Sequence, residues 1–378
     1  MTHGHREIAV FEPYLGDDTL NAVTRAFEER WLGMGMSTKE FEERLADFLE
    51  LEGRRIVATN TGTSALHLAL LSAGAGPGVE VIVPSFNFVA DHQAITATGA
   101  TPVFCDIEEE TLGLDPRRVR ELIREQTRIL LPLHFAGIPC QIDELYDIAD
   151  EHELRVVEDA THAFGSRSAD RRIGSFGDLA CFSFDPVKVI TSIDGGAVVL
   201  PDSEDLAAVQ QRRLLGIDRD TIERYANRRA WDYDVVRPGF RYHLTNVLAR
   251  IGLSQLARVD EFISNRQMYC RLYQSLLADL DGVDRLQADY GNVSPFIYCV
   301  RVSGDRRTGL IDHLAAHGIA TGIHFMPAHT YSLYQAAPRG ELPVTERVSS
   351  EIVTLPLHSF MTNSDIEFIC EAITKFFR

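Results

Sequence analysis

Short apolar runs and amphipathic helical patterns alternate along the chain between about residue 54 and residue 200. The apolar runs have the length of buried strands. They predict seven strands, at residues 56–59, 80–83, 102–105, 129–133, 155–158, 180–184 and 197–200. Apolar residues at helical spacing predict helices at residues 19–29, 39–50, 64–73, 88–97, 116–124 and 142–150. Strands that alternate with helices are typical of βαβ units, so the pattern predicts an α/β fold with a mainly parallel seven-stranded sheet.

The pattern changes after residue 200. Residues 217–243 are rich in Arg, Asp and Tyr without sustained periodicity, which predicts a long loop, and loops of that length are usually functional. A long helix is expected to start near Thr245 or Asn246, either of which can cap it. It should run to about residue 278, and smaller elements should follow it: strands at 297–302 and near 321, and helices at 308–317 and 364–377. We therefore predict a large domain at residues 1–244 and a smaller C-terminal α+β domain at residues 245–378.

Composition and charge limit the partners and the location of the protein. The chain has 378 residues, of which 45% are hydrophobic and 24% charged, as in an ordinary globular protein. The formal net charge of −18 argues against a nucleic acid as partner, because binding a polyanion requires clustered Lys and Arg. No apolar stretch has the length of a signal peptide or of the roughly twenty residues that span a bilayer, so we expect a cytoplasmic protein with no membrane partner. The six cysteines are scattered without metal-ligand spacing, so no metal site is expected.

One lysine stands in a setting where lysine is rare. Lys188 lies among apolar residues shortly after a predicted strand, and a lysine is rarely buried unless it is paired or used chemically. Asp159 follows the fifth predicted strand, at the carboxyl end where open α/β sheets bind ligands. Gly62, Thr63 and Ser64 form a small-residue turn before a helix, where backbone N–H groups can hold phosphate. These three groups match the aldehyde, the ring nitrogen and the phosphate ester of pyridoxal 5′-phosphate.

Each of these residues also has a plainer interpretation. A lysine can extend from the edge of a sheet to solvent, and a carboxylate at a strand end can cap a helix or form a structural ion pair. The presence of both Asp159 and the phosphate turn favours the chemical interpretation of Lys188. The arginines of the long loop can form a solvated surface or bind a diphosphate, and charge patterning leaves both open: Arg224, Arg228, Arg229, Arg237 and Arg241.

Short motifs along nearly the whole chain resemble one enzyme family. They are residues 31–35, 61–66, 83–88, 158–163, 174–178, 182–184 with Lys188, 245–246, 251–256 and 355–357. In order and spacing they resemble the DegT/DnrJ/EryC1/StrS family of nucleotide-sugar aminotransferases, which have the fold type I architecture of pyridoxal-phosphate enzymes. The resemblance implies a homodimer in which both subunits contribute to each active site.

The resemblance also implies individual roles. Lys188 would bond to the cofactor aldehyde and later move a proton as a general base, and Asp159 would keep the ring nitrogen protonated. Ser183 would donate to the phosphate, and Phe88, which otherwise reads as a core residue, would stack on the cofactor ring. His162 would lie near the phenolic oxygen of the cofactor, although a satisfied buried histidine is an equally good interpretation.

One segment departs from the family pattern. Many members carry an Asn that reaches across the dimer to the cofactor phosphate, followed two residues later by an Arg, where this chain has Arg241 and His243. Arg241 could replace the Asn, since a guanidinium fits phosphate geometry. Candidate contacts to the sugar and its diphosphate come from a segment that resembles the family's substrate-side loop and from the arginine-rich loop: His324, His329, Arg229 and Arg237.

The resemblance implies transamination. Glutamate would donate its amino group to give pyridoxamine phosphate, which would then aminate the keto group of a nucleotide-linked sugar for deoxyaminosugar or antibiotic biosynthesis. We expect amination at C4 of a dTDP-4-keto-6-deoxyhexose, because 4,6-dehydration creates that ketone directly, whereas a 3-keto group needs a further isomerisation. The alternatives are C3 amination and a free keto sugar or cyclitol as substrate. Dehydratases of the family carry His at the Lys188 position, and a non-catalytic cofactor-binding regulator should have lost Lys188 or Asp159, so both are disfavoured.

Overall fold

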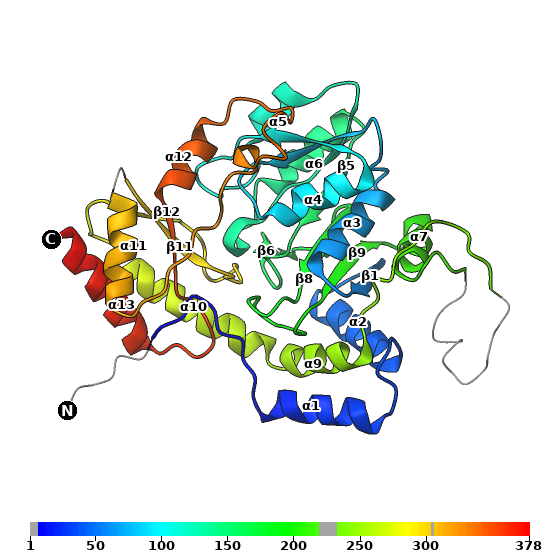
Figure 1. Ribbon diagram of the computed structural model, residues 1–378, viewed down its shortest axis with the longest axis horizontal. Helices are drawn as coiled ribbons and strands as arrows, with labels where there is room; N and C mark the ends of the chain where they lie inside the picture. Colours follow the sequence, from blue (N-terminus) through cyan, green and yellow to red (C-terminus); the bar gives the residue numbers. More distant parts are fainter. Residues whose placement is uncertain (1–6, 219–232, 304–305) are drawn as a thin grey trace.

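A seven-stranded sheet forms the centre of the structure, a computed structural model that describes residues 7–218, 233–303 and 306–378 (Figure 1). Its strands, in spatial order, are β1 (Arg54–Thr59), β9 (Gly196–Pro201), β8 (Leu179–Ser183), β5 (Arg155–Asp159), β4 (Thr127–Leu130), β2 (Glu80–Pro84) and β3 (Thr101–Cys105). All neighbouring strands are parallel except β9, which runs antiparallel to both β1 and β8. The predicted α/β fold with a mainly parallel seven-stranded sheet is confirmed.

Helices cover both faces of this sheet because its strands are apolar on both sides. Val81 and Val83 of β2 pack in one hydrophobic core, whereas Ile82 between them packs in another. Consecutive strand residues point to opposite faces, so a continuous apolar run is buried on both. Three helices contribute to the core around Val81 and Val83: α3 (Gly62–Ser72), α4 (Val89–Thr98) and α7 (Glu204–Arg213). Two helices contribute to the core around Ile82: α5 (Pro116–Leu122) and α6 (Ile142–Glu151).

Three further helices lie together beyond β1 (Figure 1). The helix α9 (Asn246–Leu256) contacts both α1 (Asp17–Glu28) and α2 (Met36–Phe48). Phe41 of α2 is fully buried against α9, where a Cβ atom on Gly252 would lie 2.6 Å from the Phe41 ring. A side chain at position 252 would therefore prevent the two helices from approaching this closely.

The long helix predicted from about residue 245 to residue 278 is in fact two helices. The first is α9, and the second is α10 (Val259–Leu276), with a break at Ala257 and Arg258. The break lets the two helices pack against different parts of the fold. The helix α9 packs on α1 and α2, whereas α10 packs on α13 (Asn363–Phe377). The Arg258 guanidinium lies 4.0 Å from the Tyr14 ring centroid at this point. No Gly or Pro marks the break, so the sequence pattern did not reveal it.

The C-terminal part has a sheet of its own. It is antiparallel, with the order β10 (Val283–Arg285), β11 (Tyr298–Val302) and β12 (Ile352–Leu355). The prediction of a strand near Thr321 is wrong, since the described residues there form only isolated bridges, one from Ile319 to Ile8 and one from Gly322 to Thr354. The C-terminal part also contains α11 (Arg306–Ala316), α12 (Pro343–Glu351) and a short 3-10 helix at Ala328–Thr330. Earlier in the chain lie another short 3-10 helix, at Phe135–Gly137, and the hairpin of β6 (Arg167–Ser168) and β7 (Arg171–Arg172). The C-terminal part is thus α+β, and the domain division at residues 244 and 245 stays a prediction.

The described ranges lack membrane-spanning helices, metal-binding clusters and disulfides. No helix in them is both long and apolar enough to cross a bilayer. They contain no group of three or more His, Cys, Asp and Glu side chains placed to hold a metal ion. All six cysteines are buried and free.

Candidate active site

A cavity of about 280 Å³ lies at the carboxyl ends of β1, β2, β5 and β8. It brings together eight of the predicted site residues: Gly62, Thr63, Phe88, Asp159, His162, Ser183, Lys188 and His324. The remaining lining residues were not predicted: Thr61, Leu66, Ala90, Asp91, Thr161, Asp185, Val187, Asp194, Phe296 and Phe325. Segments far apart in the sequence meet here because parallel strands end at the same edge of a sheet.

The start of α3 forms an anion site in this cavity. Thr61 caps the helix, since its side-chain oxygen accepts a hydrogen bond from the backbone N of Ser64 at 2.9 Å. A Cβ atom on Gly62 would lie 2.8 Å from the Cβ of Ser183, so glycine lets the helix start lie directly against the end of β8. Backbone N–H groups in the first turn of a helix lack intrahelical partners, and the helix dipole adds positive potential. Together with the Ser183 hydroxyl they suit a phosphate group.

Asp159 supplies a carboxylate held in place by neighbouring donors. It is the last residue of β5 and is 3% exposed. Its Oδ1 accepts a hydrogen bond from the backbone N of Thr161 at 2.9 Å, and its Oδ2 accepts one from Asn87 Nδ2 at 3.3 Å. The carboxylate therefore faces the cavity in a fixed orientation, where it can pair with a cationic ring nitrogen.

The residue before Asp159 anchors the strand on its other face. Glu158 is fully buried, and its two oxygens accept hydrogen bonds from the Tyr146 hydroxyl at 2.7 Å and from His134 Nε2 at 2.8 Å. His134 Nδ1 in turn accepts a hydrogen bond from the backbone N of Cys140 at 3.2 Å, so the ring proton lies on Nε2. Side chains alternate between the two faces of a strand, so Glu158 and Asp159 point in opposite directions. Glu158 holds β5 from the face opposite the cavity, and Asp159 points into the cavity.

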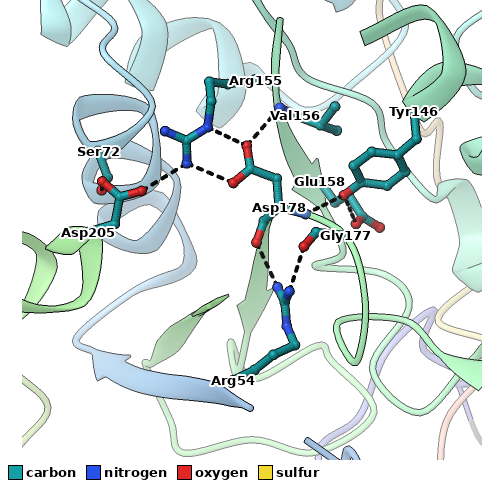
Figure 2. Close-up of polar contacts among 9 residues, drawn as sticks. All are labelled: Arg54, Ser72, Tyr146, Arg155, Val156, Glu158, Gly177, Asp178 and Asp205. Atoms are coloured by element: carbon teal, nitrogen blue, oxygen red, sulfur yellow. Dashed lines mark hydrogen bonds and ion pairs between the residues drawn. The ribbon is translucent and has the colours of Figure 1, made fainter. Parts of the chain in front are cut away.

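Figure 2 shows how this network continues along β5. Arg155, at the start of the strand, donates two hydrogen bonds to Asp178, at 2.6 and 2.7 Å. The backbone N of Asp178 donates to the Tyr146 hydroxyl at 2.8 Å. Arg54 of β1 donates to the backbone oxygens of Gly177 and Asp178 at 2.6 and 2.7 Å. These contacts tie β1, β5 and β8 together and so hold the strands whose ends carry the site.

Lys188 enters the cavity from the loop after β8. It is half-buried, and its Nζ lies 3.9 Å from the centroid of the Phe296 ring. Burial lowers the pKa of Lys188 to about 8, although the negative charges of Asp159 and Asp185 oppose this shift. A lowered pKa increases the fraction of neutral amine near neutral pH, which a nucleophilic lysine requires.

Two histidines border the cavity close to Lys188. The His162 ring centroid is 4.3 Å from that of Phe296, and its Nδ1 has no hydrogen-bond partner among the described residues. Burial, followed by the charge of Lys188, holds the pKa of His162 well below its usual value. His324 Nδ1 forms a hydrogen bond of 2.8 Å with Thr354 Oγ1, and burial lowers the pKa of His324 to about 4. Both rings are neutral near neutral pH, so each can donate or accept one hydrogen bond toward a ligand.

Other predicted residues do not line this cavity. Ser64 donates its hydroxyl hydrogen to Asn60 Oδ1 at 2.7 Å. His329 Nδ1 forms a hydrogen bond of 2.8 Å with Ser85 Oγ. Arg241 is exposed, Arg237 is partly buried, and neither belongs to the cavity wall of its own chain. Three further arginines lie outside the described residues: Arg224, Arg228 and Arg229.

Among the residues that the sequence did not predict, three contact the charged groups of the site directly: Asn87, Asp91 and Phe296. A signal for Asp91 existed, because it follows Phe88 by three residues in a predicted helix and so shares a side with it. Asn87 lies in the motif of residues 83–88, but nothing in that motif indicates that it bonds to Asp159. Phe296 comes from the C-terminal part of the chain, and no local pattern indicates that it packs against Lys188.

Comparison with known proteins places the chain in a family. The sequence model of the DegT/DnrJ/EryC1/StrS aminotransferase family matches residues 13–374. The chain belongs to this family. It is 32% identical over 370 residues to the spore coat polysaccharide biosynthesis protein SpsC of Bacillus subtilis, covering 96% of this chain and 95% of that protein. The predicted resemblance is thereby confirmed.

Solved structures of relatives superpose closely on this one. The aminotransferase TlmJ from Streptoalloteichus hindustanus gives a TM-score of 0.90 at 32% identity, with 98% of each chain covered. A protein of Streptococcus pneumoniae in its PMP form gives 0.91 at 27% identity, also with 98% of each chain covered, and its PLP form gives 0.90. The protein is therefore a sugar aminotransferase that depends on pyridoxal phosphate. The anion site, the held carboxylate and the unpartnered Nδ1 of His162 in one cavity fit that cofactor.

Proposed function

We propose that Lys188 binds the cofactor covalently in this cavity and that the protein moves an amino group from glutamate to the keto group of a nucleotide-linked sugar. The observation that carries the proposal is that an amine with a lowered pKa shares one cavity with the buried Asp159 carboxylate and the start of α3. When bound, the cofactor supplies an aldehyde and an electron-withdrawing ring. Lys188 then acts twice, as the covalent anchor and as the base that moves the proton.

The neighbouring side chains orient the cofactor in this proposal. Gly62, Thr63 and Ser183 bind its phosphate at the start of α3, with Ser64 supporting the turn through its bond to Asn60. Asp159 holds a proton on the ring nitrogen. Phe88, which is 56% exposed and borders the cavity, has the area to cover one face of the ring, and the free Nδ1 of His162 can bond to the phenolic oxygen.

The second subunit completes the site in this proposal. Large apolar side chains are exposed along α1 and the segment that follows it: Leu20, Phe27, Trp31, Leu32 and Met36. Apolar side chains gathered in this way are typical of a protein interface, which supports a homodimer. Arg241 is exposed and outside the cavity of its own chain, as expected if it reaches the cofactor phosphate of the partner.

For the substrate we favour C4 of a dTDP-4-keto-6-deoxyhexose, in deoxyaminosugar or antibiotic biosynthesis. The neutral ring of His324 at the cavity wall can bond to a sugar hydroxyl, and His329, Arg229 and Arg237 remain candidates for the outer sugar and diphosphate contacts. A 4-keto group is the direct product of 4,6-dehydration, so this substrate requires the fewest preceding steps. C3 amination and a cyclitol or unlinked keto sugar are the alternatives.

The decisive assay supplies glutamate with either a 4-keto or a 3-keto-6-deoxy nucleotide sugar and locates the new amine by NMR. Amination at C4 is expected, and clean amination at C3 with the 4-keto compound inert would overturn the choice of position. Transfer to a cyclitol but to neither nucleotide sugar would overturn the substrate class. Borohydride reduction followed by peptide mapping tests the anchor, and an adduct on any lysine other than Lys188 would refute its assignment.

A further inference from the structure

A second carboxyl group lies beside Asp159 in the cavity wall. Asp91 stands in the first turn of α4 and is 1% exposed, compared with 3% for Asp159. The amide nitrogen of Asn87 donates to Oδ2 of Asp91 at 2.6 Å and to Oδ2 of Asp159 at 3.3 Å. Two buried carboxyl groups therefore converge on one amide nitrogen, and the neighbouring Asp159 is, after burial, one cause of the raised pKa of Asp91.

The charges around this pair cannot support two carboxylates. Lys188 is the one cationic side chain among the described residues that line the cavity, while Asp185 and Asp194 also line it as acidic groups. The dipole of α4 favours a negative charge in its first turn, but this effect is smaller than the repulsion between two adjacent buried carboxylates. Burial, followed by the charge of Asp159, holds the pKa of Asp91 well above its usual range.

We infer that Asp91 is a positioning residue that stays protonated and donates a hydrogen bond to the Asp159 carboxylate. The pair then carries one proton and one negative charge between them. Asp159 is held by three groups: the backbone N of Thr161, the amide of Asn87 and the Asp91 hydroxyl. Its carboxylate keeps its orientation, and the ring nitrogen of a bound cofactor would meet one negative charge rather than two.

The effect of the Asp91–Asp159 pair on the cofactor rests on the proposed role of Asp159. The protonation of Asp91 belongs to the protein itself and can be tested on the full chain without cofactor. The competing possibility is an ionised Asp91 that serves only as an acceptor for Asn87. The substitution Asp91→Asn separates the two, because an amide can both donate to Asp159 and accept from Asn87 but cannot ionise.

The first experiment compares the unfolding of cofactor-free wild-type protein and Asp91→Asn in denaturant between about pH 5 and pH 8, at one protein concentration. A carboxyl group that is protonated when folded and ionised when unfolded loses a proton on unfolding, so the wild-type protein becomes less stable as pH rises. The ratio of the wild-type to the variant unfolding constant should rise about tenfold per pH unit. A ratio that does not change with pH would show that Asp91 is ionised and would overturn the inference.

A buried aspartate elsewhere provides the control. Asp106 is 2% exposed, and its two oxygens accept hydrogen bonds from the backbone N atoms of Val344 and Thr345, at 3.0 and 2.8 Å. Asp106→Asn replaces one of the two accepting oxygens with an NH₂ group, so one of the two backbone amides loses its acceptor. This variant should destabilise the protein across the same pH range without the tenfold rise. If Asp91→Asn behaves like Asp106→Asn, then Asp91 is an acceptor and the inference is wrong.

The second experiment measures the loaded protein. The dissociation constant of pyridoxal phosphate and the pH midpoint of the bound cofactor's absorbance should be nearly the same in Asp91→Asn as in the wild-type protein. Asp91→Leu, which cannot donate, should weaken binding at least several-fold and shift the midpoint. Equal behaviour of the Asn and Leu variants would overturn the positioning role. If Asp159→Asn also leaves the midpoint unchanged, then the proposed role of Asp159 has failed, whereas the result of the unfolding experiment stands by itself.

Discussion

The Nζ atom of Lys188 lies 3.9 Å from the centroid of the Phe296 ring. Lys188 lies in the loop after β8, and Phe296 lies just before β11. The C-terminal part of the chain therefore partly encloses the amine of Lys188. An ammonium group over an aromatic face is stabilised by about 0.5–2 kcal/mol, depending on its exposure to water. Phe296 therefore opposes the burial that lowers the pKa of Lys188 to about 8.

Replacing Phe296 with Leu should lower the pKa of Lys188 further, by up to about one unit, because the ring contact is lost while the apolar surroundings remain. The pKa is measured on cofactor-free protein, which is treated with an amine-reactive reagent at a series of pH values. The mass of the peptide that contains Lys188 gives the extent of its modification at each pH. Phe104→Leu, at a fully buried ring that packs on His92 and Tyr334, is the control and should leave the pKa unchanged. An unchanged or raised pKa in Phe296→Leu contradicts the contribution of the ring.

Because the pKa of Lys188 is lowered in the folded protein, the stability of the protein should depend on pH. The folded pKa of about 8 lies below the ordinary value of 10.5, so between these pH values the unfolded chain binds more protons and the wild-type protein gains stability as pH rises. Lys188→Met has similar length and needs no buried charge. The cofactor-free variant should be more stable than the wild-type protein below about pH 8, and its advantage should shrink toward pH 10.5.

Denaturant unfolding of both proteins across this pH range checks the prediction. Lys375→Met, at an exposed position near the end of α13, is the matched control. The difference in stability between Lys375→Met and the wild-type protein should not change with pH. A constant difference between Lys188→Met and the wild-type protein would mean that Lys188 is not desolvated when folded.

The sequence revealed the parts of the site that lie at the ends of apolar runs. Asp159, Lys188 and Gly62 each follow a predicted strand, and parallel strands deliver such residues to one edge. Phe296 could not be found in this way, because its contact depends on how the C-terminal part packs on the sheet. The break between α9 and α10 was missed for a similar reason, since the two helices change packing partners without a Gly or Pro to mark the change.

The hydrogen bonds around Glu158 of β5 predict that removing the hydroxyl of Tyr146 and removing that of Tyr298 change the stability by different amounts. Tyr146→Phe should lower the free energy of unfolding by about 1–3 kcal/mol, because it leaves Oε1 of Glu158 and the backbone N of Asp178 each without that partner, while Oε2 of Glu158 keeps its bond to His134. Tyr298 has a buried hydroxyl with no hydrogen-bond partner among the described residues. Tyr298→Phe should therefore change stability little or increase it. Equal losses in the two variants, measured by denaturant unfolding, would show that the Tyr146 bonds contribute nothing beyond packing.

The proposed shared active site predicts recovery of activity in mixed dimers. If Arg241 serves the cofactor of the partner subunit, then a dimer of one Lys188→Ala chain and one Arg241→Ala chain has one site with both residues intact and one site with neither. Equal amounts that exchange at random give hybrids as half of all dimers, each with one working site of two, so about one quarter of wild-type activity should return.

The control for this experiment pairs two residues of one cavity. Lys188 and Asp159 line the same pocket of the same chain, so a hybrid of Lys188→Ala and Asp159→Asn has no intact site and should stay inactive. Mass spectrometry of differently tagged chains verifies that hybrids form in both mixtures. No recovery with Arg241→Ala, despite such hybrids, would place Arg241 in the site of its own chain or outside any site. Full activity of Arg241→Ala alone would remove it from the site altogether, and the phosphate would then be held by the start of α3 and Ser183 without help from the partner.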